Sequence, residues 1–375
     1  MAVAKFIYDT SERSADLFYA TRFTVHDPII FFEWRGKSYL VLNDLEIDRG
    51  KREAKVDRVL PFASYLKKLQ AKGAKPRLID ILHRVFSDFH IRRLQVPRST
   101  SFALVDALRK KGYRVEAGPD PFFPERSVKT VSEVSAIEAS QRVTFAAIDH
   151  ARTLLQRSRV RRGRIVYRNA VLTSERLREY ISVFLLEHGM NAVNPPIVSC
   201  GIQSCDGHEI GHGPLKPHQS IVMDVFPRSL KTFYFGDATR TFCKGRAPDA
   251  LKRLFATVRE GEKLGLQMVR AGRNGRVIHE AIVTFFEKNG FPTGEKEGRI
   301  QGFMHGTGHA IGLEVHEEPS RINRYDCTLK RGMVMTVEPG LYYSAIGGVR
   351  LEDIAVVNRS GCTVLAHYPK ELEIR

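Results

Sequence analysis

Residues 305–317 read HGTGHAIGLEVHE, a stretch that holds three of the chain's 13 histidines: His305, His309 and His316. The first two are four residues apart, which would place both imidazoles on one face of a helix, but the two glycines between them disfavour a helix. Glycine instead permits irregular main chain that passes close to a neighbouring group. A single histidine in such a place is usually a core residue. Three histidines within 12 residues are not easily explained as core residues. The stretch therefore predicts irregular backbone at a functional site.

Two aspartates lie inside apolar runs upstream of this stretch. Asp224 occurs in IVMDVF and Asp237 in YFGDATRTF, and these runs predict strands at Ser220–Phe226 and Thr232–Phe242. A buried carboxylate costs several kcal/mol unless it is paired or bound to a metal. Asp237 follows a glycine and also suits a turn or a helix N-cap, whereas Asp224 does not. Both aspartates are therefore candidate metal ligands.

Two glutamates lie downstream, in VMTVEPGLY and GGVRLEDIAVV. Glu338 ends an apolar strand before a Pro-Gly turn, and Glu352 opens the next strand, two residues after Arg350. Carboxylates aimed from adjacent strands toward one point repel each other unless a cation lies between them. Arg350 can neutralise one carboxylate but not four, so we expect a bound cation.

The residue types of this set indicate its chemistry. Four carboxylates and one imidazole form a hard, oxygen-rich set that suits two divalent ions sharing bridging carboxylates, and it is too acidic for a structural zinc site. Two such ions can hold a hydroxide between them and polarise a carbonyl. That combination is typical of metal-assisted amide hydrolysis.

Length and composition predict a folded protein with two domains. The chain has 375 residues, of which 43% are hydrophobic and 27% are charged, so it differs clearly from disordered chains. At roughly 100–200 residues per domain, this length predicts two domains. Three prolines in Gly118–Arg126 exclude a continuous helix there, and we expect domains of residues 1–127 and 128–375.

The two expected domains differ in their sequence pattern. Residues 1–127 alternate short apolar runs with helical patterns, which predicts an α/β domain. In residues 128–375 helices are followed by strands, twice, which predicts an α+β domain with two similar halves. Thr130 and Glu133 form a capping-box signature ahead of a long helix at about Ser132–Gln156.

Charge and cysteine content limit the partners and the location. The 59 Lys and Arg residues exceed the 42 Asp and Glu residues by 17, but the surplus is spread along the chain. Nucleic-acid binding normally needs a clustered basic element, so we expect no nucleic-acid partner. The five cysteines are an odd set without a Cys-x-x-Cys pair, and no apolar run is long enough to span a bilayer. We expect a reduced, cytoplasmic protein with no membrane partner.

The order Asp, Asp, His, Glu, Glu, together with HGxGHxxGLxVHE, TVEPGLY and VRLED, resembles the pita-bread metallopeptidases. The similarity is greatest to the aminopeptidase P and prolidase branch, which cleaves before proline. The motifs run from about Pro195 to Val357, and before residue 128 only the general layout is similar. The resemblance implies an α+β fold, with a C-terminal pita-bread (creatinase/aminopeptidase) domain preceded by an α/β N-terminal domain of the creatinase/prolidase type.

The resemblance also implies a role for each candidate ligand. Asp224 would chelate one metal ion, and Asp237 would bridge both. His309 and Glu338 would bind the second ion, and Glu352 would bridge. Glu338 would also exchange a proton with the metal-bound water. Of the divalent metals, manganese suits a carboxylate-rich site, and the same ligands accept cobalt, zinc or iron.

Further roles follow from the same resemblance. His316 would hydrogen-bond the scissile carbonyl as charge develops on its oxygen. His208 and His305 would line the pocket on the proline side. Thr239 and Arg350 would orient the carboxylates.

The chain departs from the family in one hairpin and offers one competing histidine. Asp224 and Asp237 are 13 positions apart, two more than in the commonest family form. Two extra residues preserve the parity of the strands, so both aspartates can still face one side of the sheet. His212 competes with His208 for the pocket role, and we favour His208 because Cys205 precedes it at the family's spacing.

The leading hypothesis is a two-metal exopeptidase that removes the N-terminal residue from Xaa-Pro peptides or dipeptides. A methionine aminopeptidase shares the ligands but usually lacks a large N-terminal domain. A creatinase-like hydrolase without metal is disfavoured by the intact ligands. A fourth alternative is an inactive pita-bread protein that binds RNA or protein through its basic surface, which the intact ligands and the scattered charge oppose. By family analogy we expect a homodimer.

Overall fold

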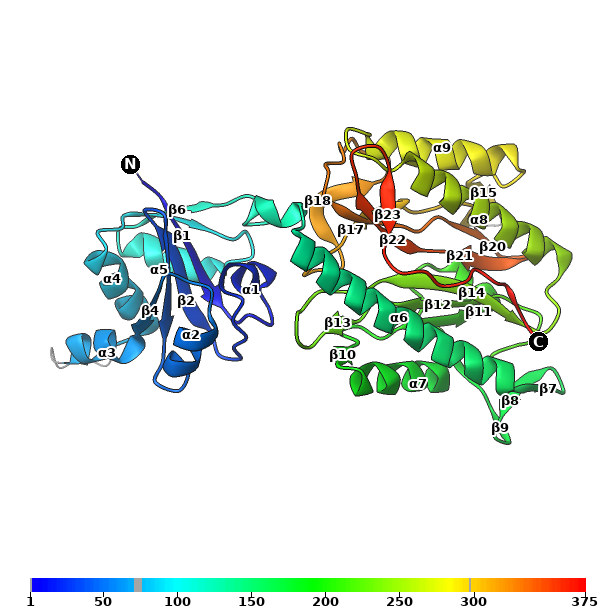
Figure 1. The fold of residues 1–375 in the computed structure, drawn as a ribbon, viewed down its shortest axis with the longest axis horizontal. Coiled ribbons are helices and arrows are strands. Elements are labelled where there is room, and N and C mark those ends of the chain that lie inside the picture. The colour runs from blue at the N-terminus through cyan, green and yellow to red at the C-terminus, as the bar shows by residue number, and fades with distance from the viewer. Residues whose placement is uncertain (1, 71–75, 297) are drawn as a thin grey trace. The chain divides into compact units, whose positions relative to one another are not determined.

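The computed structural model describes residues 2–70, 76–296 and 298–375 (Figure 1). The chain divides into two compact units, Met1–Arg126 and Ser127–Arg375, which we call unit 1 and unit 2. Each unit has its own hydrophobic core. All candidate ligands lie in unit 2.

In its described residues, unit 1 contains a six-stranded mixed sheet in the order β4-β3-β2-β1-β5-β6, with helices packed around it (Figure 1). Both faces of the sheet are buried: Phe6 and Phe32 pack on one side, and Ile7 and Phe31 pack on the other. The strands are β1 (Ala4–Asp9), β2 (Ile29–Trp34), β3 (Lys37–Leu42), β4 (Arg58–Pro61), β5 (Arg93–Val96) and β6 (Arg114–Ala117). The helices are α1 (Ala15–Thr21), α2 (Ile47–Glu53), α3 (Phe62–Gln70), α4 (Leu78–Asp88) and α5 (Phe102–Lys110).

Unit 2 begins with the long helix α6 (Val131–Arg157), close to the predicted limits. The Thr130 side chain accepts a hydrogen bond from the Glu133 N–H, and the Glu133 carboxylate accepts one from the Thr130 N–H. This capping box satisfies two N–H groups that the first turn leaves without helical partners. The other helices are α7 (Ser174–Glu187), α8 (Asp249–Met268) and α9 (Gly275–Lys288).

Two larger sheets carry the rest of unit 2. In the described residues, one has four strands, namely β11 (Ile197–Cys200), β12 (Ile221–Val225), β14 (Ala238–Lys244) and β24 (Glu373–Ile374). The other has five strands in the order β18 (Glu317–Ile322), β17 (Gly308–Ala310), β19 (Val334–Val337), β22 (Asp353–Val357) and β23 (Cys362–Val364). Shorter strands are β7 (Arg159–Arg161), β8 (Arg164–Tyr167), β9 (Ala170–Val171), β10 (Met190–Asn191), β13 (Arg228–Ser229), β15 (Gly294–Lys296), β16 (Arg299–Gln301), β20 (Gly340–Tyr343) and β21 (Gly347–Arg350).

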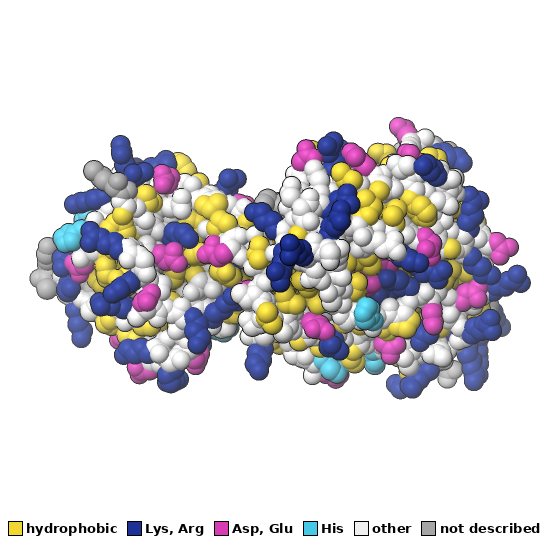
Figure 2. Space-filling model, turned by 45° about the horizontal axis from the view of Figure 1, so that its top comes forward, with side chains coloured by type: hydrophobic (Ala, Val, Ile, Leu, Met, Phe, Trp, Pro, Cys, Tyr) yellow, Lys and Arg dark blue, Asp and Glu magenta, His cyan; other side chains and the backbone are white. Residues whose placement is uncertain are grey.

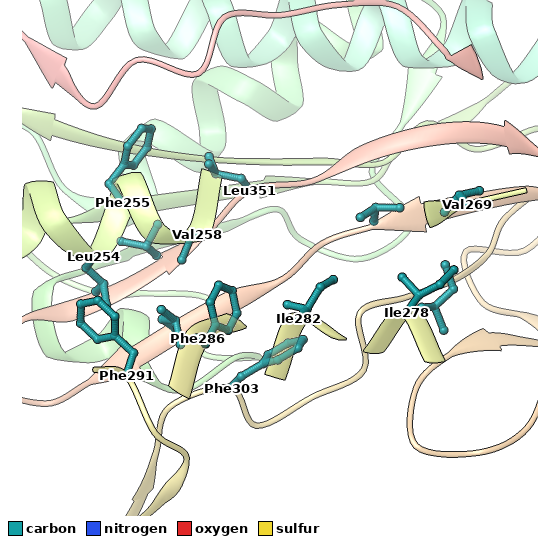
Figure 3. Close-up of a cluster of buried hydrophobic side chains, with 14 of the residues drawn as sticks. Leu254, Phe255, Val258, Val269, Ile278, Ile282, Phe286, Phe291, Phe303 and Leu351 are labelled. Atoms are coloured by element: carbon teal, nitrogen blue, oxygen red, sulfur yellow. The ribbon is translucent and has the colours of Figure 1, made fainter. Parts of the chain in front are cut away.

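Each large sheet is covered by one pair of helices (Figure 1). Helices α6 and α7 bury their apolar sides against β11, β12 and β14. Helices α8 and α9 do the same against the strands around β19 and β21. Figure 3 shows this second core, in which Val258 of α8 and Phe286 of α9 lie near Leu351. The arrangement agrees with the expected two halves of helices followed by strands.

The predicted strand Thr232–Phe242 is wrong in its first half. The structure begins β14 at Ala238, and the preceding aromatic run forms a turn in which Phe233 has a φ of 62°. The Ser229 N–H donates to the Tyr234 carbonyl at 3.0 Å, and the Tyr234 hydroxyl donates to the Glu133 carboxylate at 2.6 Å. Contacts with the start of α6 therefore override the strand propensity of the aromatic residues.

Surface charge and helix length bear on the expected partners. Figure 2 shows Lys and Arg side chains dispersed over the visible face rather than gathered in one patch. Among the helices of the described ranges, we find none with the length and apolar character that a membrane crossing requires.

Candidate active site

The two candidate aspartates lie on adjacent antiparallel strands. Asp224 is in β12 and pairs with Thr239 of β14, and Asp237 lies one residue before β14 begins. Side chains two residues apart in a strand share a face. Asp224, Thr239 and Asp237 therefore share one face of the four-stranded sheet. Met223 and Val225 point the other way, into the core beneath α6 and α7.

The histidine stretch that was expected to be irregular contains a short strand. His309 is the middle residue of β17, whose pairing with β18 shifts register between His309 and Ala310. A Cβ atom placed on Gly308 would lie only 1.9 Å from the carbonyl oxygen of Thr336 in β19. The glycine thus permits the predicted close approach, and the His309 N–H donates to the Thr336 hydroxyl at 3.0 Å.

The two candidate glutamates flank the next pair of strands. Glu338 directly follows β19, and Glu352 directly precedes β22. Val337 pairs with Asp353 in this antiparallel ladder, so extending the register by one residue places Glu338 opposite Glu352. The Glu352 N–H donates to the Thr239 carbonyl at 3.1 Å, which joins the two large sheets at this point.

These elements bring the candidate ligands together. Ligand atoms of Asp237, His309 and Glu352 all lie within 4.8 Å of one another, and all three side chains are buried. His309 Nε2 lies 3.7 Å from Asp237 Oδ2 and 3.4 Å from Glu338 Oε1. Asp224 joins the group through Arg350, whose Nη2 donates to Asp224 Oδ2 at 2.7 Å.

The carboxylates raise one another's pKa values. Burial, together with the charges of Asp224 and Glu338, raises the pKa of Asp237 well above its usual value. Burial and the charge of Asp237 do the same for Glu352. Burial raises the pKa of Glu338 to about 7, although the Arg350 charge acts against this shift. Crowded carboxylates whose ionised forms are disfavoured gain most from a cation placed between them.

The protonation state of His309 supports the same conclusion. Burial, with a smaller contribution from His316, lowers the His309 pKa to about 3, so the ring is neutral near pH 7. Its Nδ1 lies 3.2 Å from the Ala310 carbonyl oxygen, which only accepts hydrogen bonds, so Nδ1 carries the proton. The unshared pair of Nε2 then faces Asp237 and Glu338, so the three side chains can bind one cation placed between them.

Unpaired oxygen atoms at the same place fit a metal ion. Within the described residues, Asp224 Oδ1 and Glu352 Oε1 are buried and have no hydrogen-bond partner. A buried oxygen without a partner costs about 1–3 kcal/mol, and a metal ion would remove that cost. The donor set and these two atoms together fit bound divalent ions.

Thr239 and Arg350 contact the carboxylates that they were expected to orient. The Thr239 hydroxyl donates to Glu352 Oε2 at 2.8 Å and accepts from Arg350 Nε at 3.2 Å. Arg350 is 4% exposed and spans from Thr239 to Asp224, so one guanidinium holds both sides of the group.

Sequence reasoning did not single out Tyr342, although it lies in the TVEPGLY motif. Its hydroxyl lies 2.7 Å from His305 Nε2 and accepts from Arg350 Nη1 at 3.0 Å. Burial and the Arg350 charge lower the His305 pKa to about 3, and His305 Nδ1 donates to the Gly306 carbonyl at 2.7 Å. Nε2 is therefore the acceptor, and Tyr342 donates to it while it accepts from Arg350.

Gln141 of α6 was also missed. It is fully buried, and its amide exchanges two hydrogen bonds of 2.8 Å with the main-chain N–H and C=O of Asp237. This pair fixes the backbone of a candidate bridging ligand. A glutamine inside an apolar helix face was the available signal, since such a polar group needs a partner.

The remaining histidines lie at the edge of the group. The His316 ring packs edge-on against His309 with centroids 4.2 Å apart, and its side chain is exposed. His208 is exposed too, and its charge contributes to the lowered pKa values of His305 and His316, after burial as the main cause. His212 instead contacts Gln203 and lies 3.6 Å from Glu209. The preference for His208 over His212 in the pocket therefore stays a prediction.

Comparisons with known proteins agree with this geometry. The sequence model of metallopeptidase family M24 matches residues 135–359. The uncharacterized peptidase YqhT of Bacillus subtilis is 28% identical over 250 residues, which cover 66% of this chain and 65% of YqhT. The Xaa-Pro dipeptidase of Pyrococcus furiosus is 25% identical over 345 residues, which cover 89% of this chain and 85% of that enzyme.

Solved structures resemble the whole chain. The X-Pro aminopeptidase from Thermotoga maritima aligns with a TM-score of 0.82 at 22% identity, over 99% of this chain and 97% of that one. The Xaa-Pro dipeptidase from Bacillus anthracis gives the same score and identity, over 99% and 95% of the two chains. At this identity the likeness concerns the fold, and it confirms the predicted fold class.

Proposed function

Because the chain belongs to metallopeptidase family M24, we propose that it is a metal-dependent exopeptidase that hydrolyses the N-terminal Xaa-Pro bond of peptides or dipeptides. The observation that carries the proposal is the neutral His309 whose Nε2 faces Asp237 and Glu338 at less than 4 Å. The names of the relatives from Pyrococcus furiosus and Thermotoga maritima support the choice of Xaa-Pro substrates.

Five side chains would hold two divalent ions, with manganese as the first candidate: Asp224, Asp237, His309, Glu338 and Glu352. Bound ions would polarise the scissile carbonyl and acidify a water molecule. Glu338 would move a proton at its carboxylate, which is the role that the family resemblance implies for this residue.

Three histidines would contact the substrate. Burial lowers the pKa of His316, so its neutral ring can donate an N–H to the scissile carbonyl oxygen while charge develops there. His208 and His305 would line the proline-side pocket. The hydrogen bond from Tyr342 would keep the His305 ring in one orientation.

The first experiment is hydrolysis of a small peptide panel by chelator-stripped protein, with and without added Mn²⁺. The panel holds Xaa-Pro dipeptides, Xaa-Pro-Yaa tripeptides and a Met-Ala-Yaa peptide. Cleavage of Xaa-Pro-Yaa that returns with metal would establish an aminopeptidase, and cleavage restricted to dipeptides would establish a dipeptidase. Cleavage of Met-Ala-Yaa alone would favour a methionine aminopeptidase.

The ligand assignment has its own test. Asp237→Ala and Glu352→Ala should each lower metal-dependent kcat/KM by at least about 1000-fold, because each removes a bridging carboxylate. Lys252→Met, a change at the surface, should leave the metal-dependent kcat/KM unchanged. Persisting hydrolysis in the alanine variants would overturn the proposal. If the wild type cleaves no peptide with any divalent metal, an inactive protein that binds RNA or protein becomes the better hypothesis.

Two expectations on assembly and location are proposals of the same kind. We expect a homodimer, which light scattering of the full chain would test, and a cytoplasmic location, which fractionation of the source cells would test.

A further inference from the structure

A chain of buried charges lies behind the candidate metal site. Arg240 of β14 is 1% exposed, and Asp353, the first residue of β22, is 5% exposed. Neighbouring residues in a strand point to opposite faces. Thr239 and Glu352 therefore point into the site, while Arg240 and Asp353 point away from it.

Arg240 contacts the main chain of Glu352 and of Thr239, the residue that hydrogen-bonds the Glu352 carboxylate. Its Nη1 donates to the main-chain carbonyl of Glu352 at 2.6 Å and to that of Thr239 at 3.0 Å. The Thr239 hydroxyl in turn donates to Glu352 Oε2. One guanidinium thus fixes the backbone on both sides of the hydrogen bond that aims the carboxylate.

Arg240 is held in place by Asp353. Its Nη2 donates to Asp353 Oδ1 at 2.7 Å and to the Tyr368 carbonyl at 3.1 Å, and its guanidinium lies 4.9 Å from the centre of the Phe145 ring. The second Asp353 oxygen accepts from Lys370 Nζ at 2.6 Å. A carboxylate shared by two cations keeps one orientation more rigidly than one with a single partner.

Lys370 connects this chain of charges to another element. Its Nζ lies 2.7 Å from Glu262 Oε2 on α8, and the Glu262 side chain is 1% exposed. Lys370 is itself 20% exposed and lies beside an open hollow between α8 and β23. It therefore joins α8, β22 and the C-terminal segment, and it can be replaced with less disturbance than the fully buried Arg240.

We propose that Lys370, acting through Asp353 and Arg240, is a positioning residue for the Glu352 carboxylate and so sets the affinity of the site for divalent metal. The inference rests on the proposed function, because it takes Glu352 as a metal ligand. Outer contacts of metal ligands are typically worth 10- to 100-fold in metal affinity, and Lys370 acts two contacts further out than Arg240, so we expect a smaller effect from it.

The test measures metal binding rather than activity. Chelator-stripped full-length protein is titrated with Mn²⁺ by calorimetry, well below the melting temperature of each variant. Lys370→Met should raise the Kd for Mn²⁺ at least threefold, and Asp353→Asn should raise it about tenfold or more. Since Lys370 acts only through Asp353, the double variant should bind Mn²⁺ with the Kd of Asp353→Asn alone.

Lys252 supplies a matched control. It pairs with Glu373 at 3.4 Å and so also joins α8 to the C-terminal segment, but among the described residues its ion pairs include neither Asp353 nor any contact with Arg240. Lys252→Met should leave the Kd for Mn²⁺ unchanged. A general loosening of the C-terminal segment would alter both variants alike.

The outcomes separate the two proposals. A wild-type protein that binds no Mn²⁺ would overturn the proposed function itself. If the wild type binds Mn²⁺ but Lys370→Met has the same Kd, or if the two substitutions add independently in the double variant, the positioning role of Lys370 is wrong while the metal site stands.

Discussion

At the scale of single residues, the site combines groups whose pKa values move in opposite directions. Burial keeps His309 neutral and Glu338 partly protonated near pH 7. A neutral imidazole can bind a metal directly, whereas a carboxylic acid must lose its proton first. Metal binding at this site should therefore release protons, and more of them at pH 6 than at pH 8.

The raised pKa of Glu338 predicts how this residue affects the stability of the metal-free protein. Its pKa is about 7 in the folded state and 4.5 when unfolded, so between these values the folded state holds more protons. The contribution of Glu338 to the free energy of unfolding is therefore fully present below pH 4.5. It falls by about 3 kcal/mol as the pH rises to 7. His305 and His309, with lowered pKa values, act in the opposite direction, so the comparison must be with Glu338→Gln.

Urea unfolding in EDTA at pH 5 and pH 8 measures the effect. The free energy of unfolding of the wild type should fall relative to that of Glu338→Gln between the two pH values. Equal pH dependence in the two proteins would show that Glu338 ionises at its ordinary pKa.

At the scale of elements, the packing of β17 against β19 positions His309. Gly308→Ala would place a methyl group 1.9 Å from the Thr336 carbonyl, so the strands must separate. We expect a loss of about 1–3 kcal/mol in stability and a clear loss of Mn²⁺ affinity. Gly294→Ala in β15, where an added methyl group meets nothing within 4 Å, is the control. Calorimetry of both variants checks this, and unchanged binding in Gly308→Ala would contradict the role of the close contact.

Elements with a local sequence signal were predictable, and contacts between elements were not. The capping-box sequence at Thr130 predicts the start of α6, because the hydrogen bonds of this motif lie within one turn of the helix. The ligand-bearing segments were predictable because a carboxylate in an apolar strand demands an explanation. The turn at Phe233 was missed because distant contacts determine it. Gln141 and Tyr342 were missed because Asp237 and His305, which they contact, lie 96 and 37 positions away along the chain.

At the scale of the whole molecule, the candidate ligands draw on both halves of unit 2 and on no residue of unit 1. Asp224 and Asp237 lie in or next to strands of the four-stranded sheet, and His309, Glu338 and Glu352 lie in or next to strands of the five-stranded one. A bound ion should therefore stabilise the junction between these two sheets.

Hydrogen exchange followed by mass spectrometry tests this distribution. Adding Mn²⁺ to stripped protein should slow exchange in β12, β14, β17, β19 and β22 and leave the strands of unit 1 unchanged, because a ligand stabilises the parts that its binding holds together. Equal slowing in unit 1 would contradict a metal site confined to unit 2.

The junction between the two sheets also has a consequence in time. The Thr239–Glu352 hydrogen bond joins residues 113 positions apart, and closing so long a loop costs entropy before the contact stabilises the chain. We expect this contact to form after the folding transition state. Interactions that are absent from the folding transition state slow unfolding without speeding folding. The refolding rate should then be the same with and without Mn²⁺, while the unfolding rate drops in its presence. The supply of metal would then determine the lifetime of the native state against unfolding, but not the rate at which the chain folds.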